Sequence, residues 1–335
     1  MNSPLVSICV PFYNTALYIE RCVRSIMEQT YPNIEYVFVN DGSTDDSFAV
    51  LENILKEYPE RNKKVNIITN DRNRGTAYSR RIYTENAHGE YITCVDSDDY
   101  VELDMVQCLV DKALKTKADV VVAGYYYKNG DYTEICEPHQ CDDGLDFTSL
   151  VLSSSLNSMW GKLFIRSLFT EGRSCFAPEG LDYGEDRLML LFLSTKVINV
   201  ATINQPFYHY IHRSDSITQN KNERHFRCLI RFWQEVDNLL KELGLSEKYK
   251  YIVGAHKIEN KAFLLMHCDS NRTRKKYMNL YAEEERIYNP KLTRGVALMY
   301  WLTKHHLWAL TYCYQCYIRW LDYKKNHSHL NKKTQ

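Results

Sequence analysis

Two hydrophobic patterns alternate along the first 124 residues of the chain. Short apolar runs, which are typical of buried strands, predict strands at 6–10, 34–39, 65–69, 91–95 and 119–123. Apolar residues at helical spacing lie between these runs and predict helices over 17–27, 47–58, 76–87 and 103–117. Near-continuous apolar strands that alternate with helices indicate a mostly parallel sheet with helices on both faces. The predicted fold class is therefore α/β and Rossmann-like.

The alternation does not continue through the rest of the chain. Residues 125–134 predict a hairpin with an Asn-Gly turn, and residues 184–193 predict a helix that begins with acidic side chains. From about residue 220 the apolar spacing becomes helical over long stretches. The pattern therefore predicts one domain over residues 1–220 and a helical C-terminal region over residues 221–335.

The composition of the 335-residue chain is that of a globular protein, with 44% hydrophobic and 25% charged residues. The 42 Lys and Arg residues balance 42 Asp and Glu residues, so the overall charge gives no support for nucleic-acid binding. The first ten residues have neither the basic segment nor the long apolar run of a secretion signal. The 11 cysteines fit free thiols in a reducing compartment, and we expect a cytoplasmic protein.

Polar side chains follow three of the predicted strands, at the point where each strand ends. They occupy residues 11–14, 40–43 and 96–99. Ligands of a parallel sheet bind beyond the carboxyl ends of its strands, so we expect these three segments to converge on one pocket.

The third of these segments is strongly acidic. Asp96, Asp98 and Asp99 lie close together in the chain, and two carboxylates about 4 Å apart repel by roughly 4 kcal/mol at an effective dielectric constant of about 20. Such carboxylates can bind Mg²⁺ or Mn²⁺, with substrate phosphates completing the coordination shell. The alternative is an acidic loop that caps the helix beginning near Glu102. An isolated D-x-D pattern leaves both interpretations open.

Five segments together resemble the family 2 glycosyltransferases, which have the GT-A fold. They follow one another in the family's order over about residues 5–190 and read VSICVPFYN (6–14), YVFVNDGSTDDS (36–47), NDRNRGTAYSR (70–80), YITCVDSDD (91–99) and GED (184–186). The resemblance implies a catalytic domain of bacterial polysaccharide-synthesis type. Such a domain transfers a sugar from a nucleotide-sugar donor to a hydroxyl of a glycan or lipid-linked acceptor, with inversion at the anomeric carbon.

The resemblance also implies a donor site at the ends of the strands. Asp41 would accept a hydrogen bond from the uracil N–H, which favours a UDP-sugar, although Asp and Gly are also common turn residues. Asp96 and Asp98 would hold Mn²⁺ or Mg²⁺ on the diphosphate, where the cation offsets the charge of the leaving group. The residues implied in donor binding are Pro11, Tyr13, Asn14, Asp41, Asn73, Gly75, Arg80, Asp96 and Ser97.

Asp186 matches the catalytic base of the family, which would take the proton from the acceptor hydroxyl in a single displacement. The alternative is a charge that complements the N-terminus of a helix. Glu185 and Trp160 are candidates for acceptor contacts, and Trp160 is equally well explained as a core residue. His209 and His212 are further candidate metal ligands, although histidines on a strand are more often packed and hydrogen-bonded.

The most apolar long stretch of the C-terminal region is 296–321. Lys304, His305 and His306 interrupt it, so a membrane-spanning helix is not expected. Its aromatic residues and the basic tail that follows suit a peripheral membrane contact through residues 296–333. A buried packing helix or an oligomer contact explains the same pattern equally well.

Two other functions compete with a glycosyltransferase. Aspartate-nucleophile phosphatases also carry a D-x-D motif after a strand, but their motif continues with Thr or Val, where this chain has Tyr100. A non-catalytic glycan-binding module could keep the fold, yet the acids Asp41, Asp96, Asp98 and Asp186 are all retained. The sequence leaves the donor sugar, the acceptor, the linkage and the oligomeric state open.

Overall fold

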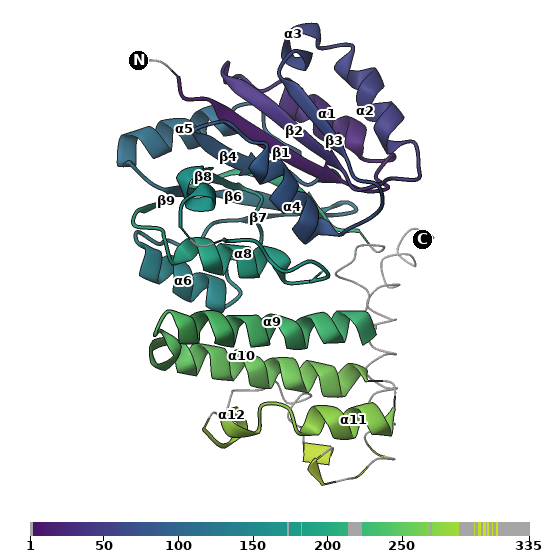
Figure 1. Cartoon of the computed structure of the whole chain (residues 1–335), viewed down its shortest axis with the longest axis vertical. Coiled ribbons are helices and arrows are strands. Elements are labelled where there is room, and N and C mark those ends of the chain that lie inside the picture. The colour runs from purple at the N-terminus through teal and green to yellow at the C-terminus, as the bar shows by residue number, and fades with distance from the viewer. Residues whose placement is uncertain are drawn as a thin grey trace. The chain divides into compact units, whose positions relative to one another are not determined.

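The computed structural model describes residues 3–172, 174–181, 183–213, 223–268 and 270–287, together with residues 298, 301, 302, 304, 305, 307, 310 and 313 (Figure 1). The chain divides into two compact units. The first comprises residues 1–220 and 230–239, and the second comprises residues 221–229 and 240–335. The sheet and all the predicted site residues belong to the first unit.

Parallel strands form one half of the sheet, in the order β3-β2-β1-β4. They are β1 (Val6–Phe12), β2 (Ile34–Asn40), β3 (Val65–Thr69) and β4 (Tyr91–Cys94), which confirms the first four predicted strands. In the parallel register, Phe12 lies opposite Asn40 and Cys9 lies opposite Cys94. The carboxyl ends of β1, β2 and β4 therefore lie along one edge of the sheet.

The other half of the sheet mixes parallel and antiparallel pairs. The short strand β8 (Lys162–Ile165) runs antiparallel to β4 and to β6 (Val120–Asn129), and β6 pairs in parallel with β9 (Val200–Ile211). Strand β7 (Tyr132–Cys136) completes the predicted hairpin with β6, and β5 (Tyr100–Val101) pairs with β9. The sequence does not reveal β8, because a four-residue run that begins with a lysine is too short to show a period.

Helices connect the strands of the first unit. They are α1 (Ile19–Met27), α2 (Ser47–Leu55), α3 (Pro59–Asn62), α4 (Thr76–Glu85), α5 (Met105–Thr116), α6 (Gly144–Leu152), α7 (Ser167–Thr170) and α8 (Glu185–Ser194). Two of them, α4 and α8, carry predicted site residues: Arg80 lies in α4, and Asp186 lies in the first turn of α8.

Several predicted helix boundaries differ from the structure by two or three residues, and two of these differences have a clear physical reason. The first helix begins at Ile19, and Leu17, which was expected inside it, is 88% exposed. The backbone before this helix is instead held by the side chains of Asp45, in the loop after β2, and of Ser47, the first residue of α2. The second predicted helix ends at Leu55 instead of Tyr58, because Pro59 disfavours the helical conformation at the residue before it.

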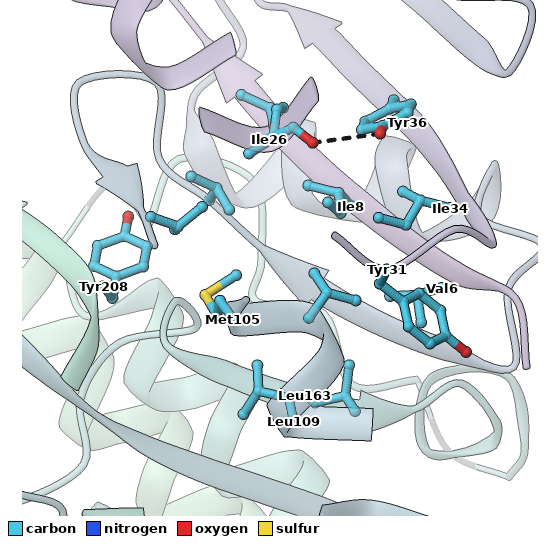
Figure 2. Close-up of a cluster of buried hydrophobic side chains, with 14 of the residues drawn as sticks. Val6, Ile8, Ile26, Tyr31, Ile34, Tyr36, Met105, Leu109, Leu163 and Tyr208 are labelled. Carbon is cyan, nitrogen blue, oxygen red and sulfur yellow. Dashed lines mark hydrogen bonds between the residues drawn. The ribbon is translucent and has the colours of Figure 1, made fainter. Parts of the chain in front are cut away.

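The main apolar core packs the parallel strands against α1 and α5 (Figure 2). Ile8 and Ile34 are completely buried there, together with Ile26 of α1 and Leu109 of α5. Each such side chain contributes roughly 1.5–3 kcal/mol to folding when it leaves water. The Tyr36 hydroxyl donates to the carbonyl oxygen of Ile26 at 3.3 Å, as Figure 2 shows. This packing fixes the strands whose ends carry the predicted site.

The described part of the second unit is helical, as expected for the C-terminal region. It contains α10 (Ser246–His267), α11 (Asn271–Met278) and α12 (Ala282–Ile287), while α9 (Glu223–Glu242) contributes residues to both units. Among the residues described, no helix is long and apolar enough to cross a membrane. The segment 296–333 lies outside the described residues except for isolated positions. The domain boundary near residue 220 stays a prediction.

Candidate active site

Asn14 ties the loop after β1 to the loop after β2. Its backbone has a left-handed conformation (φ 51°), which Asn tolerates better than most residues. Its side-chain oxygen accepts the N–H groups of Thr44 and Asp45, and its own N–H donates to the Ser43 hydroxyl. The ring of Tyr13 beside it is 42% exposed. Two predicted donor residues thus lie at the edge where β1 and β2 end.

Asp41 organises the loop after β3. Its buried carboxylate accepts the N–H groups of Arg74 and Gly75 at 3.0 and 2.8 Å, and the side-chain amide of Asn70 at 2.7 Å. Gly75 has φ 89°, a conformation that residues with a side chain rarely adopt. A carboxylate has about four acceptor sites, so one site on Asp41 remains for a further hydrogen-bond donor.

The other predicted donor residues follow the same edge of the sheet. Pro11 is half-buried near the end of β1, and Ser97 is 5% exposed in the turn after β4. Asn73 is exposed in the loop after β3. The three predicted polar segments therefore lie at neighbouring strand ends.

The acidic turn after β4 contains one buried carboxylate and two accessible ones. Asp99 is 1% exposed and accepts the Tyr208 hydroxyl at 2.7 Å and the N–H of Ile211 at 2.8 Å. The side chains of Asp96 and Asp98 keep 28% and 29% of their surface exposed. Burial and the neighbouring carboxylates raise the pKa of Asp98, and they raise the pKa of Asp99 well above its ordinary value. Asp96 and Asp98 are thus the members of the turn that can meet a ligand.

A single buried arginine joins this acidic turn to helix α8. Arg80 is 2% exposed, and its Nη2 lies 3.2 Å from Asp96 Oδ1. The same nitrogen donates to Asp186 Oδ2 at 3.1 Å, and Nε lies 2.5 Å from Asp186 Oδ1. Asp186 Oδ2 also accepts the N–H of Met159 at 3.0 Å. The fold therefore brings together three of the predicted site residues.

Burial shifts the pKa values of Asp186 and of the ionisable groups around it. It raises the pKa of Asp186, against the opposing charge of Arg80, and it raises the pKa of Glu185 to about 8, with the Asp186 charge adding to this shift. Lys162 is 3% exposed, and burial lowers its pKa to about 8. Its ammonium donates to the carbonyl oxygen of Ser158 at 2.7 Å. No sequence pattern singles out Lys162, because its position follows from the unpredicted strand β8.

The two candidate histidine ligands lie in aromatic surroundings. His209 stacks on the rings of Tyr100 and Tyr126, at centroid distances of 4.1 and 4.5 Å, and its Nε2 lies 2.7 Å from a carboxylate oxygen of Glu102. The ring of His212 packs beside a tyrosine of β6. In the part of the chain that the structure describes, no group of three or more His, Cys, Asp or Glu side chains is arranged to hold a metal ion.

Asp96 and Asp98 form the donor set that fits a divalent cation. Mg²⁺ and Mn²⁺ bind hard carboxylate oxygens, and one or two carboxylates suffice where phosphates and water complete the shell. Arg213 Nη1 lies 3.1 Å from Asp98 Oδ2, so this carboxylate already has a positive group beside it. The Arg213 guanidinium also lies over the ring of Tyr18, 4.2 Å from its centroid.

Trp160 belongs to an aromatic cluster next to these carboxylates. Its ring stacks on those of Tyr208 and Tyr210, at centroid distances of 4.4 and 5.4 Å, and meets Tyr125 edge-on. The hydroxyl of Tyr208 also accepts the N–H of Asp96. Packing explains these contacts of Trp160, and its contact with an acceptor stays a prediction. The sequence does not mark Tyr208 as a site residue, because it is one of 26 tyrosines.

Comparison with known proteins identifies similar sequences. Residues 7–169 match the family model described as glycosyl transferase family 2. The chain is 31% identical over 234 residues to the glycosyltransferase GlyG of Streptococcus pneumoniae, an alignment that covers 65% of this chain and 74% of GlyG. It is 34% identical over 252 residues to the glycosyltransferase GlyA of the same organism, which covers 71% of this chain. The match spans only 35% of GlyA.

Two solved structures have a similar fold and are distant in sequence from this chain. The TM-score is 0.66 with Staphylococcus aureus TarS 1–349 in complex with UDP-GlcNAc, at 19% identity, covering 82% of this chain and 79% of TarS 1–349. It is 0.54 with the mannosyltransferase PcManGT of Pyrobaculum calidifontis in complex with GDP-Man and Mn²⁺, at 17% identity, covering 95% and 84% of the two chains. These likenesses confirm the predicted α/β fold of the GT-A type.

Proposed function

This chain belongs to glycosyl transferase family 2, and from this membership we propose that it transfers a sugar from a nucleotide-sugar donor to a hydroxyl group of a glycan or lipid-linked acceptor. Membership also removes the phosphatase alternative. The observation that carries the proposal is the link through Arg80, which lies within 3.2 Å of both Asp96 and Asp186. This link supports a reaction in which donor and acceptor meet between the two carboxylates.

The proposed donor is a UDP-sugar. Asp41 has one acceptor site left for the uracil N–H, while Tyr13 and Asn14 flank it at the end of the neighbouring strand. The structural neighbours TarS and PcManGT carry UDP-GlcNAc and GDP-Man respectively, so they support a nucleotide sugar without deciding the base. The choice of uridine rests on Asp41.

The proposed cofactor is Mn²⁺ or Mg²⁺, held by Asp96 and Asp98. Both carboxylates keep accessible surface, and burial, together with the charge of Asp96, raises the pKa of Asp98. When bound, such a cation offsets the charge that develops on the departing diphosphate. Arg213 is a second positive group beside Asp98 that can stabilise the same charge.

The proposed base is Asp186. In an inverting displacement the acceptor oxygen attacks the anomeric carbon from the side opposite the diphosphate, and the base takes its proton. Asp186 Oδ2 accepts hydrogen bonds from Arg80 and Met159, whereas Oδ1 accepts none and is the oxygen left for that hydroxyl. Glu185 and Trp160 are proposed acceptor contacts. A cytoplasmic location with a peripheral membrane contact stays a prediction from the sequence.

A screen of nucleotide sugars tests the function. The purified chain is melted with UDP-, GDP- and TDP-sugars, in Mn²⁺ and in EDTA, and hydrolysis of each donor is followed. A cognate donor at 100 times its Kd should stabilise the fold by about 2.7 kcal/mol, and EDTA should abolish the effect. The proposal is wrong if no nucleotide sugar stabilises the chain and none is hydrolysed. Equal stabilisation in EDTA would remove the metal from it.

A further inference from the structure

We propose that Arg80 is a positioning residue, which holds the donor-side carboxylate Asp96 and the base Asp186 in one fixed arrangement and does not bind the donor itself. This inference rests on the proposed function, in which Asp186 accepts the proton of the acceptor hydroxyl. The sequence motif alone suggested a different role for Arg80, namely direct contact with the donor.

The burial of Arg80 argues against a donor contact. Its side chain is 2% exposed, so it has almost no surface to offer a diphosphate. Nη1 donates to the Tyr83 hydroxyl at 3.2 Å, and Nη2 donates to Asp96 and Asp186. Nε makes no hydrogen bond, but it is buried and faces Asp186 in an ion pair. A buried guanidinium whose nitrogens all face protein groups exposes no edge that could chelate a phosphate.

A buried network holds the guanidinium from the side opposite the carboxylates. Tyr83 lies one turn further along α4 and is completely buried. Its hydroxyl lies 3.0 Å from Cys94 Sγ, at the end of β4. Arg80 is therefore fixed both to its own helix and to the strand that leads into the acidic turn. A site residue is held within a fraction of an ångström only when packing locks its supports in this way.

The geometry of arginine matters in this position. Its planar fork can face two carboxylates at once, whereas the ammonium of lysine is a point charge on a flexible chain. Asp96 follows β4 and Asp186 lies in the first turn of α8, so the fork fixes the distance between two separate elements. A lysine at this position keeps the charge but loses the two-sided contact.

The charges that face Asp186 support the same role. Arg80 and Lys162 are the positive groups, and Asp96 and Glu185 are the negative ones. Burial favours the protonated form of Asp186, and a protonated carboxyl cannot accept the acceptor's proton. Arg80 opposes this effect of burial more strongly than any other group. Its contact thus holds the base in place and opposes its protonation.

The test compares Arg80→Lys with Arg81→Lys. Arg81 is the next residue on α4 and is 45% exposed, which makes it a matched control. Its guanidinium lies 3.7 Å from a carboxylate oxygen of Glu85 and over the ring of Tyr78, both on its own helix. For each variant, turnover of the donor found in the screen, its KM, the affinity for UDP with Mn²⁺ and the melting temperature are measured. We expect Arg80→Lys to lower kcat by roughly 10–10²-fold, since small misplacements of a reacting group have effects of this size. UDP affinity should stay within about twofold, and Arg81→Lys should match the parent.

The same substitution in the Asp186→Asn background separates positioning from other roles. If Arg80 acts through Asp186, Arg80→Lys should change the residual rate by less than about twofold there, because residues that act as a unit are not additive. The inference is wrong if Arg80→Lys lowers the rate by the same factor in the Asp186→Asn background as in the parent. It is also wrong if Arg80→Lys weakens UDP binding while kcat is retained. Near-parental kcat and KM in Arg80→Lys would reduce Arg80 to a structural residue.

Two further results distinguish a failure of this inference from a failure of the proposed function. If Asp186→Asn turns over like the parent, the assignment of the base is wrong whatever Arg80 does, and the inference falls with it. If Asp186→Asn is inactive while Arg80→Lys affects only donor binding, the inference alone is wrong. Should Arg80→Lys not fold, Tyr83→Phe removes only the hydroxyl behind Nη1. It should lower kcat and leave UDP affinity unchanged, and the opposite pattern would overturn the inference.

Discussion

Both units of the chain bury charged side chains, and they balance these charges differently. In the second unit, Lys257 and Lys261 of α10 are buried, and each has a glutamate of α12 within 2.8 Å. In the first unit, two carboxylates share the single guanidinium of Arg80, and further acids stand beside them. The arrangement in the second unit is typical of structural ion pairs, because each lysine there has a glutamate of its own.

The excess of carboxylates in the first unit has a measurable consequence. Burial raises the pKa values of Asp98, Asp99, Glu185 and Asp186, and the charge of a neighbouring carboxylate adds to each of these shifts. A buried cluster of like charges destabilises a fold unless something offsets it, and such clusters gather at functional sites. We call the carboxylates around Arg80 in the first unit the first cluster, and the ion pairs between α10 and α12 in the second unit the second cluster. We therefore expect substitutions in the first cluster to change activity and substitutions in the second cluster to change stability.

The largest effect is expected at Asp186. Asp186→Asn keeps the shape of the side chain but removes the group that accepts the proton, which should lower the transfer rate by about 10²–10⁴-fold. Donor affinity should survive, because the proposed diphosphate site lies at Asp96 and Asp98. Rate, donor affinity and melting temperature are measured on the same variant.

The competing outcome is equally specific. If Asp186 only complements the N-terminus of α8, the variant should keep its turnover and lose about 0.3–1 kcal/mol of stability. A stable variant with near-parental transfer would therefore place Asp186 among the structural charges, and Glu185 would become the next candidate for the base.

The opposite result is expected in the second unit. Lys261→Met leaves Glu285 without its closest cation and should destabilise the second unit by about 1–3 kcal/mol. This is less than for a fully buried pair, because Glu285 keeps 24% of its surface exposed. Chemical denaturation measures the loss, and donor hydrolysis per folded molecule should not change.

Two controls sharpen this prediction. Lys250→Met removes an exposed pair with Glu247 on the same helix, where the loss should stay below about 1 kcal/mol. Adding Glu285→Gln to Lys261→Met should recover part of the stability, since replacing both partners is less harmful than leaving one charge unpaired. Reduced turnover in Lys261→Met at full folding would contradict the division of roles between the two clusters.

More of the site in the first unit than of the second cluster could be predicted from the sequence. Strand ends and turn residues are local, so Asp41 and Asp96 could be placed at one edge of the sheet from the apolar runs before them. The meeting of Asp96 with Asp186 depends on contacts between distant segments, and only the family resemblance suggested it. Neither source revealed that Arg80 is buried, because a helix pattern does not show what covers a charged face. Lys261 lies in an ordinary helical pattern, and nothing local marks its burial.

A moderate effect is expected at the accessible end of the first cluster. Asp98→Asn replaces a charged ligand by a neutral one and should weaken the affinity for UDP with Mn²⁺ by about tenfold, or ~1.4 kcal/mol. The matched control is Asp111→Asn on α5, an exposed residue bonded to Gln107. Calorimetry of UDP with and without Mn²⁺ distinguishes the two. Equal affinity in Asp98→Asn and the parent would remove Asp98 from the metal site.

The smallest effect is a pH dependence of stability at Glu185. Burial, with the Asp186 charge, raises its pKa from an ordinary 4.5 to about 8, so the folded chain binds this proton more tightly than the unfolded chain does. The stability that this proton confers is fully present below about pH 4.5 and is lost as the pH rises towards 8. The parent should therefore lose stability over this window relative to Glu185→Gln, which cannot ionise. The slope should be a fraction of the ~1.4 kcal/mol per pH unit that one proton can give, because Glu185 is only partly buried. Denaturation of both proteins at pH 5, 6, 7 and 8 measures the difference. If the free energies of unfolding of the two proteins change in parallel with pH, Glu185 is ionised throughout this range. The first cluster then holds one more negative charge than it would with a protonated Glu185.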